Sequence, residues 1–232
     1  MNISLILPVH NEEMNLDSLF NEIFDSGLYS ILNEIIFVDD FSEDKSSEII
    51  EKLKLNYNKI KLLKNHKNYG QSYSIYKGIE NAKSDVVATI DADGQNIPSD
   101  LLKLIKVFEN NDFQLVSGIR NQRKDHLIKI ISSKIANSFR RLILKDTCLD
   151  TGCSLKVFER SLFLSFNFFN GVHRFIPSLF ECCGYKVKYI YVNHRKRIYG
   201  QSNYGTLKRM FVGIYDTFKV RKIILNKNKI NV

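Results

Sequence analysis

The segment VVATIDADGQNIP, residues 86–98, joins a short apolar run to two carboxylates, Asp91 and Asp93, with Gly94 and Gln95 directly behind them. The apolar run is rich in β-branched residues and uninterrupted, which is typical of a strand buried on both faces of a sheet. Asp and Gly then favour a turn. The segment therefore predicts a buried strand that ends in an acidic loop, and a calcium loop, a magnesium–nucleotide site and an ordinary turn are all open interpretations.

The first half of the chain repeats this strand pattern. Short apolar runs occupy residues 3–9, 34–39, 59–63, 85–90 and 113–117. Apolar residues at helical spacing lie between them, most clearly after Pro98-Ser-Asp100. Alternating strands and helices with continuous apolar strands predict an α/β fold, a mostly parallel sheet with helices on both faces. In such sheets, ligands bind beyond the carboxyl ends of the strands.

Three acidic segments follow strand ends in this scheme. They are PVHNEE at residues 8–13, DDFSED at residues 39–44 and DADGQ at residues 91–95. Each alone is compatible with a turn or a helix cap, since Asp and Asn favour both. Together they predict one acidic edge of the sheet.

The positions of residues along the loop distinguish between these interpretations. An EF-hand needs Gly at position 6 and Glu at position 12. Counted from Asp91, the glycine falls at position 4 and position 12 is Leu102, so calcium is excluded. Mg²⁺ or Mn²⁺ with a nucleotide diphosphate fits better, because such a cation takes few protein carboxylates and completes its shell with phosphate and water. The glycine patterns of P-loop NTPases and dinucleotide oxidoreductases are missing from the sequence.

The charge is unevenly distributed. The chain has 232 residues, enough for one sizeable domain, and a net charge of +9. Residues 186–232 hold 12 Lys and Arg against one acid, Asp216, whereas the remainder holds 22 basic and 24 acidic residues. The basic C-terminal fifth indicates an anionic partner: nucleic acid, an anionic membrane surface or a phosphorylated substrate.

The second half predicts two basic amphipathic helices, over residues 127–145 and 207–218, a strand over 186–194 and a frayed tail over 226–232. No apolar run approaches the roughly 20 residues of a membrane span. The N-terminus lacks a basic n-region, and the four cysteines show no zinc spacing. We therefore expect a cytoplasmic protein with reduced thiols.

Further motifs continue in order: NYG (68–70), SGIRNQR (117–123), SKIAN (133–137), DTGCSLKVF (150–158), GVHRFIP (171–177) and HRKRIYGQSNY (194–204). With the acidic segments, they resemble the family 2 glycosyltransferases of the GT-A (Rossmann-like) fold, and most closely the polyprenyl-phosphate sugar transferases typified by dolichol-phosphate mannose synthase. The resemblance covers about residues 3–216. It implies one GT-A domain over residues 1–225, with a nucleotide-sugar-binding half (1–118), an acceptor-binding half (119–225) and an amphipathic C-terminal helical segment.

The resemblance also implies roles on the donor side. The base and ribose of a GDP- or UDP-linked sugar would be bound by Pro8, His10, Glu12, Asp39, Asp40 and Asp91. Asp91, Asp93 and Gln95 would hold Mg²⁺ or Mn²⁺ on the diphosphate, and Asp91, Asp93 and Arg120 would be catalytic.

On the acceptor side, the resemblance implies a polyprenyl (dolichyl or undecaprenyl) phosphate. Its phosphate would be bound by Arg120, Arg123, Lys129, Ser133, Arg195, Arg197 and Ser202. A phosphate monoester is largely ionised near neutral pH, so its oxygen can attack the anomeric carbon directly, and an in-line attack transfers the hexosyl group with inversion. The sequence departs from the family pattern at Asn203, where a Lys is usual.

Several alternatives stay open at this point. The acceptor could be a saccharide in surface polysaccharide or lipopolysaccharide assembly, and a nucleic-acid-binding module is a competitor from another class. Arg120 and Arg123 could be surface cations paired with Asp125, and His173 and Arg174 could be structural. With a lipid acceptor, we expect peripheral binding at the cytoplasmic face, through an anionic membrane surface or a membrane partner subunit. A homo-oligomer also stays open.

Overall fold

The computed structural model describes residues 1–121, 127–197, 199 and 206–230; the side chains of 127–134, 206–211 and 227–230 are outside this description. The strands are β1 (Ile3–Val9), β2 (Glu34–Asp39), β3 (Ile60–Lys64), β4 (Val86–Thr89), β5 (Leu115–Arg120), β6 (Lys156–Glu159) and β7 (Val187–Val192). The helices are α1 (Glu13–Asp25), α2 (Leu28–Ile31), α3 (Ser46–Asn56), α4 (Gln71–Glu80), α5 (Pro98–Glu109), α6 (Leu127–Leu144), α7 (Arg160–Leu164), α8 (Val172–Cys182) and α9 (Thr206–Ile230).

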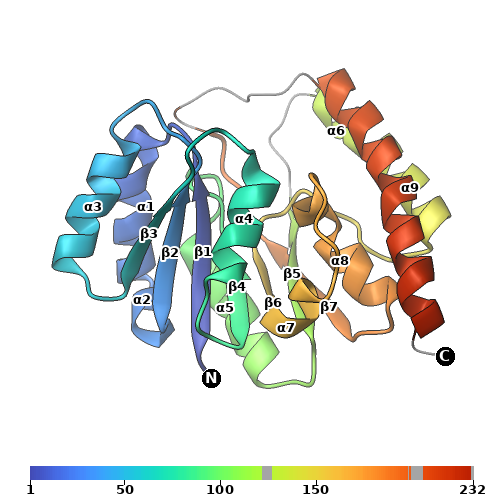
Figure 1. The fold of residues 1–232 in the computed structure, drawn as a ribbon, viewed down its shortest axis with the longest axis horizontal. Helices are drawn as coiled ribbons and strands as arrows, with labels where there is room; N and C mark the ends of the chain where they lie inside the picture. The colour runs from blue at the N-terminus through green and yellow to red at the C-terminus, as the bar shows by residue number, and fades with distance from the viewer. Residues whose placement is uncertain (122–126, 198, 200–205, 231–232) are drawn as a thin grey trace.

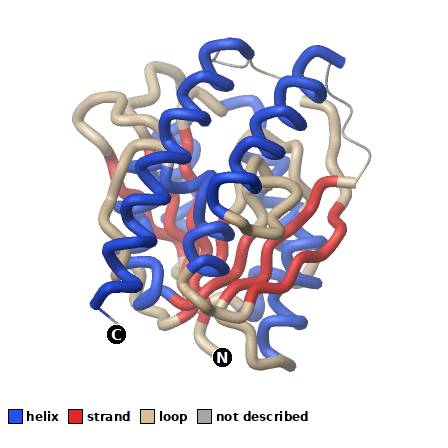
Figure 2. The backbone as a smooth tube through the Cα atoms, turned by 90° about the vertical axis from the view of Figure 1, so that its right-hand side faces the viewer, coloured by secondary structure: helices blue, strands red, loops and turns tan. Residues whose placement is uncertain are grey.

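The strands form one seven-stranded sheet in the order β3-β2-β1-β4-β6-β5-β7, with helices on both sides (Figures 1 and 2). β1 pairs in parallel with β2 and β4, β2 with β3, and β5 with β7. Only β6 runs antiparallel, between β4 and β5, among the described strands. The predicted mostly parallel α/β fold is confirmed.

Two apolar cores lie against the two faces of this sheet. One joins alternate residues of β1, such as Leu5 and Leu7, to α1, α2, α3 and α5. The other joins Ile6 and Phe158 to α4, α7, α8 and the end of α9. Strand residues on both faces are buried, so the strands read as continuous apolar runs, as expected for a sheet covered on both sides.

The second half of the chain differs most from the sequence-based expectation. β6 was not predicted, because its four residues are too few for a period and include a lysine. α8 was not predicted either, because Pro177 interrupts its pattern and its aromatic residues suggested only a core. Phe166 and Phe175 do lie in that core.

The predicted amphipathic helices correspond to α6 and α9, which pack side by side, with the rings of Phe139 and Phe218 5.9 Å apart (Figure 1). α9 continues to Ile230, past Asn226, where we expected the chain to fray. In the part of the chain that the structure describes, none of the helices is both long and apolar enough to cross a membrane. All four cysteines are free thiols.

Candidate functional site

The carboxyl ends of β1 and β2 are joined by a reciprocal brace between the loops that follow them. Asn11 N–H donates to Ser42 Oγ (3.0 Å), and Glu43 N–H donates to Asn11 Oδ1 (2.8 Å). Asn11 and Phe41 have positive φ values of 56° and 63°. Such backbone conformations cost energy in residues other than glycine, so the surrounding contacts must hold them. The two acidic loops are therefore fixed relative to each other.

Asp40 organises the next loop, which leads into α4. Its Oδ1 accepts from Asn65 Nδ2 (2.7 Å) and Tyr69 N–H (2.9 Å), and its Oδ2 accepts from Gly70 N–H (2.7 Å). Gly70 has φ 88°, a conformation that favours glycine. Asp39 likewise accepts from Ser42 N–H and the Ser47 hydroxyl. Both buried carboxylates thus shape the loops at this edge.

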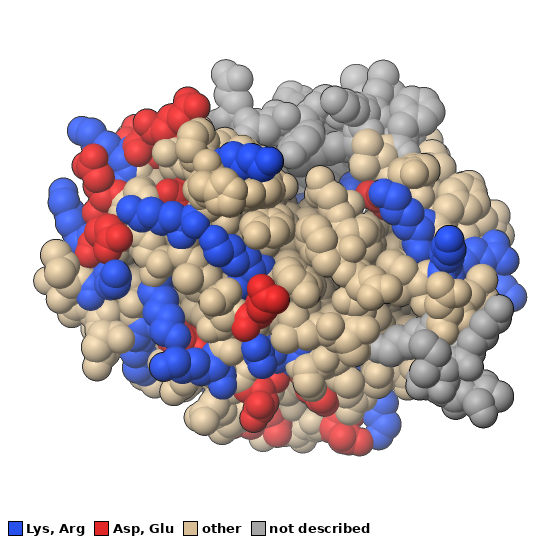
Figure 3. Space-filling model, viewed as in Figure 1, with Lys and Arg blue, Asp and Glu red and all other residues tan. Residues whose placement is uncertain are grey.

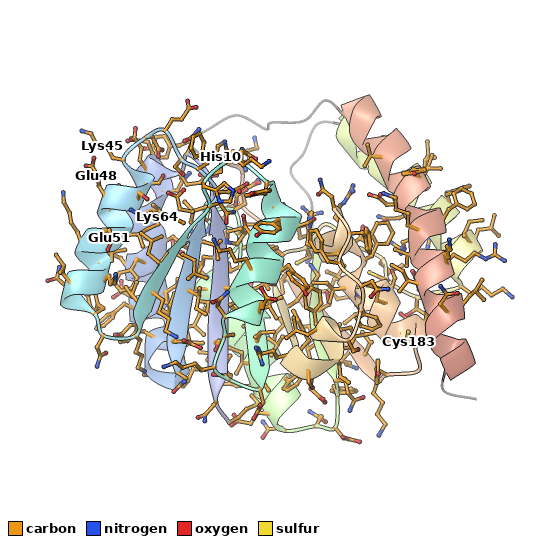
Figure 4. The ribbon with its side chains drawn as sticks, in the orientation of Figure 1. His10, Lys45, Glu48, Glu51, Lys64 and Cys183 are labelled. Carbon is orange, nitrogen blue, oxygen red and sulfur yellow. The ribbon has the colours of Figure 1, made fainter. Side chains whose placement is uncertain are left out.

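His10 connects the same loops, and Figure 4 shows it at the upper end of the sheet. Its Nδ1–H donates to the Asp40 carbonyl oxygen (3.0 Å), and its Nε2 accepts from Asn68 Nδ2 (3.1 Å). These partners fix the neutral tautomer, because a carbonyl only accepts and an amide nitrogen only donates. Pro8 lies two residues earlier, paired with Val38 in the sheet.

Hydrogen bonds fix the start of the acidic loop after β4. Ser154 accepts from Asp91 N–H (3.1 Å) and from Asn96 Nδ2 (2.8 Å) through its Oγ. Asp91 Oδ1 accepts from Gln71 Nε2 at the start of α4 (2.7 Å). Asp93 Oδ1 accepts from Gln95 N–H (3.1 Å), within the same turn. Asp91 therefore meets the start of α4, and Asp93 lies close enough to Glu12, just after β1, for their charges to interact.

Each ionised carboxylate at this edge makes ionisation of the neighbouring carboxyl groups less favourable. Burial and the neighbouring charge of Asp93 raise the pKa of Asp91 to about 7, against the opposing charges of Lys156 and Arg120. Burial also raises the pKa of Glu12, although a hydrogen bond from Asn15 and the charge of Arg197 oppose it. Such a cluster of carboxylates gains from an additional cation.

Lys156 is a site residue to which the sequence reasoning gave no role. It lies on β6 opposite Thr89, 3% exposed, and its ammonium donates to the Cys153 carbonyl oxygen. Burial lowers the pKa of Lys156, against the charges of Cys153 and Asp91. Its position inside an apolar strand could have identified Lys156 from the sequence, because a buried cation needs nearby negative charge.

The segment of residues 194–197 crosses the loop that carries Asp93 and Gln95. Arg195 N–H donates to the Gln95 carbonyl oxygen (2.9 Å), and Gln95 Nε2 donates back to the Arg195 carbonyl oxygen (3.2 Å). His194 bridges to Asn96 in the same antiparallel pairing. Arg197 Nη2 then reaches Asp93 Oδ2 at 2.6 Å.

The predicted acceptor residues are each held in a different way. Arg120 forms a two-pronged ion pair with Asp150 (2.7 and 2.8 Å), and its side chain is 13% exposed, so it is not a surface cation. A Cβ at Gly152 would lie 2.5 Å from its Nη2, which explains the need for glycine. Arg195 pairs with Glu22 of α1 (2.8 Å).

The remaining acceptor predictions stay predictions. Arg123, Ser202 and the alternative partner Asp125 are outside the described residues, and so are the side chains of Lys129 and Ser133 on α6. His173 and Arg174 both connect elements: His173 Nδ1 lies 2.5 Å from Ser72 Oγ of α4, and Arg174 pairs with Asp216 of α9 (2.8 Å).

The residues present fit a divalent cation that shares its ligands with a substrate. No group of three or more His, Cys, Asp or Glu residues arranged for a metal occurs within the described ranges. Asp91, Asp93 and Gln95 offer two carboxylates and one amide oxygen. Mg²⁺ and Mn²⁺ accept so few protein ligands when phosphate oxygens complete the shell. The donor set therefore suits a metal–diphosphate complex better than a metal held by protein alone.

The architecture matches solved glycosyltransferase structures. A crystal structure of glucosyl-3-phosphoglycerate synthase from Mycobacterium tuberculosis, in complex with Mn²⁺, uridine diphosphate and glucosyl-3-phosphoglycerate, superposes with a TM-score of 0.72. The match covers 95% of this chain and 79% of that one at 17% identity. A complex of the same enzyme with Mn²⁺ and UDP-glucose gives 0.72 at 18% identity, with 95% and 78% of the two chains covered. At this identity the likeness shows a shared GT-A-like fold.

Sequence comparison defines the family. The model of glycosyl transferase family 2 matches residues 4–165, and the chain belongs to this family. The undecaprenyl-phosphate 4-deoxy-4-formamido-L-arabinose transferase of Pectobacterium carotovorum subsp. carotovorum (strain PC1) is 33% identical over 211 residues, 89% of this chain and 64% of that protein. The equally named protein of Yersinia pestis (strain Pestoides F) is 30% identical over 92% of this chain and 65% of its own length. The chain thus spans slightly less than two thirds of these relatives.

Proposed function

We propose that the protein transfers a glycosyl group from a nucleotide diphosphate sugar to a polyprenyl phosphate, with a divalent cation and inversion at the anomeric carbon. The observation that carries this proposal is the 33% identity, over 89% of the chain, to a relative named for transfer to undecaprenyl phosphate. The acidic edge at the ends of β1, β2 and β4 supports it. Residues 1–118 would bind the donor and residues 119–225 the acceptor.

The loops around Asp40 support the donor half of this proposal. Asp40 fixes Tyr69 and Gly70 at the start of α4, and Gln71 there donates to Asp91. The N-terminus of a helix attracts anions through its unpaired N–H groups and its dipole. Together with Pro8, His10, Glu12 and Asp39, this arrangement is suited to a nucleoside diphosphate, and UDP is the first to test.

Asp91, Asp93 and Gln95 would hold the cation, either Mg²⁺ or Mn²⁺. When bound, the metal would act as a Lewis acid that stabilises the negative charge of the departing nucleoside diphosphate. The protein's own contribution is to keep the carboxylates in place and ionised: Ser154 fixes the Asp91 backbone, and the charge of the buried Lys156 favours ionised Asp91.

For the acceptor, the phosphate oxygen itself is the nucleophile, and cationic side chains would position it. Arg120 is the described candidate, and it is already paired with Asp150. The alternative of a saccharide acceptor is favoured by one observation: Arg120, Arg195 and Arg197 each have a carboxylate partner. A phosphate acceptor would have to compete with these partners.

A donor and acceptor panel tests the proposal. Radiolabelled UDP- and GDP-sugars, including UDP-linked 4-deoxy-4-formamido-L-arabinose, are incubated with the protein, Mn²⁺ and either undecaprenyl phosphate or undecaprenol. We expect label in the organic phase only with the phosphorylated lipid and one class of donor. A parallel reaction contains an oligosaccharide acceptor in place of the lipid. Label that passes to this oligosaccharide and never to the lipid phosphate would support the saccharide alternative and overturn the proposal.

We further propose that α6 and α9 place the protein on an anionic membrane surface. Their outward side includes Leu142, Tyr215, Phe218 and Leu225, which are 75%, 64%, 51% and 53% exposed. Basic side chains gather at the right of Figure 3. On α9, Lys219, Arg221 and Lys222 are exposed. Apolar groups flanked by cations favour binding to anionic lipid.

Vesicle sedimentation tests this surface. The protein should sediment with phosphatidylglycerol vesicles but not with phosphatidylcholine vesicles, and Phe218→Glu should release it. Leu55→Glu is the matched control, since Leu55 is an exposed apolar residue on α3 (86%). Equal binding of both variants would indicate that α6 and α9 do not carry the contact, and would direct attention to a membrane partner subunit.

A further inference from the structure

Arg197 lies against the acidic edge, beside Asp93. Its Nη2 donates to Asp93 Oδ2 at 2.6 Å, and its side chain is 28% exposed against 9% for Asp93. Although burial acts to lower the pKa of Arg197, the hydrogen bond to Asp93 and the charges of Asp93, Glu12 and Asp91 outweigh it and raise that pKa. Arg197 thus serves as a cation for several carboxylates at once.

The backbone brings Arg197 to this position by a specific pairing. Asn96 and His194 form an antiparallel bridge, and Gln95 and Arg195 exchange two hydrogen bonds of 2.9 and 3.2 Å. The segment 194–197 is therefore fastened to the very loop that carries Asp93 and Gln95. The contact between Arg197 and Asp93 follows this pairing along the chain and is made by the side chains.

A guanidinium and a divalent cation compete for the same oxygen. Asp93 Oδ1 accepts from Gln95 N–H, and Oδ2 accepts from Arg197, so a metal ion that binds Asp93 Oδ2 meets Arg197 there. Two cations at one carboxylate oxygen repel each other, and the more mobile one moves. A diphosphate on the metal would offer the displaced guanidinium a new partner, because guanidinium groups bind phosphate oxygens in a two-pronged geometry.

We propose that Arg197 is an internal counter-ion of the metal-binding loop, which neutralises Asp93 until metal and nucleotide bind and then transfers its guanidinium to the diphosphate. The inference rests on the proposed function in taking Asp91 and Asp93 as the metal-binding carboxylates. It gives Arg197 a role on the donor rather than on the acceptor phosphate. It also makes metal and nucleotide binding mutually dependent, since each removes an obstacle to the other.

Mn²⁺ binding measured without any sugar or acceptor tests the proposal. The free-ion EPR signal is titrated with protein at about pH 8, where Asp91 is largely ionised. Relative to the wild type, Arg197→Gln should bind Mn²⁺ alone roughly tenfold more tightly, a difference of about 1.4 kcal/mol. The same variant should bind UDP in the presence of Mn²⁺ roughly tenfold more weakly. A residue that only supports the loop would weaken both.

The matched control is Lys186→Gln. It also removes one positive charge and an ion pair of 2.6 Å, with Asp112, but on the side of the sheet where β7 begins. It should leave both affinities unchanged. Arg197→Lys, which keeps the charge without the planar fork, should bind Mn²⁺ alone as the wild type does while losing UDP affinity, and it serves if Arg197→Gln folds poorly.

Two results would overturn the proposal, and they differ in scope. If the wild type binds Mn²⁺ and Arg197→Gln binds it no more tightly, only the counter-ion role fails. If Asp93→Asn and the wild type bind Mn²⁺ equally, the metal site of the proposed function fails as well.

Discussion

The proposed donor half (residues 1–118) and the proposed acceptor half (residues 119–225) are stabilised by different kinds of interaction. At the ends of β1 and β2, carboxylates accept from neutral N–H and O–H groups: Asp40 alone accepts three such hydrogen bonds. Beyond residue 119, carboxylates face arginines, in the pairs Arg120–Asp150, Arg140–Asp146 and Arg174–Asp216. The loops at the ends of β1 and β2 are therefore preformed, whereas the arginines beyond residue 119 would have to exchange partners to bind a phosphate.

This difference has an energetic consequence. Neutral donors to a carboxylate leave its negative charge in place, so the ends of β1 and β2 stay electronegative and attract a cation. A buried ion pair is neutral as a whole, but removal of one partner leaves an unpaired charge. Substitutions in the donor half should therefore affect metal and nucleotide binding, and those in the acceptor half should affect folding or acceptor binding.

The largest effect should come from Asp93→Asn. The change removes one of two carboxylates offered to the cation, and we expect glycosyl transfer to fall by at least about 10³-fold, since the metal carries the leaving-group stabilisation. Folding, measured by thermal melting, should not change. Asp112→Asn, at an exposed acid, is the control. Transfer by Asp93→Asn within tenfold of the wild type would contradict the role of this edge.

Arg140→Met probes the acceptor half where its ion pair is most buried. The side chains of Arg140 and Asp146 are 3% and 0% exposed, and Arg140 Nε and Nη2 each donate to Asp146 at 2.9 Å. Loss of the cation should lower the free energy of unfolding by about 3–5 kcal/mol. Lys186→Met breaks the exposed pair with Asp112 and should cost at most about 1 kcal/mol. Urea unfolding measures the free energy of unfolding of both variants. Equal losses would contradict the proposed importance of the buried ion pair.

Arg120→Gln should distinguish an effect on acceptor binding from an effect on donor binding. A charge-assisted hydrogen bond to phosphate contributes about 1.5–3 kcal/mol, so the acceptor KM should rise roughly 10- to 100-fold. The KM of the nucleotide sugar should rise less than that of the acceptor, because Arg120 acts on the donor side only through its charge, which favours the ionised form of Asp91. Steady-state kinetics with each substrate varied in turn gives both values. An equal rise in both would place Arg120 on the donor.

Lys156→Met tests a buried cation on β6, whose charge acts on Asp91. Without Lys156, Asp91 loses a charge that favours its ionised form, so Mn²⁺ affinity at about pH 7 should fall roughly tenfold. The loss should diminish at higher pH, where Asp91 ionises regardless. Lys188→Met, at an exposed lysine of β7, is the matched control. A loss that does not depend on pH would show that Lys156 acts through packing alone.

The same contrast explains which features of the fold and the site could be predicted from the sequence. Strands β1, β2 and β4 are continuous apolar runs followed by acids, so period and position predicted both the strands and the acidic edge. β6 is short and antiparallel. A role for its Lys156 follows only from the nearby charge of Asp91, which lies 65 residues earlier in the sequence. The partners of Arg120 and Arg197 also depend on contacts between distant segments. The family resemblance supplied those residues but not what they touch.

The smallest predicted effect is a pH dependence of metal stabilisation, and its sign follows from Asp91. The folded-state pKa of about 7 lies above the ordinary value of 3.8, so the folded protein binds the proton more tightly than the unfolded chain. Without metal, the Asp91 contribution to stability is therefore full below about pH 4 and is lost as the pH rises to about 7. Mn²⁺ binds the ionised carboxylate and reverses this loss. We expect the rise in Tm caused by millimolar Mn²⁺ to be a few degrees larger at about pH 8 than at about pH 6. The difference should vanish in Asp93→Asn, and a rise in Tm of equal size at both pH values would show that Asp91 does not titrate in this window.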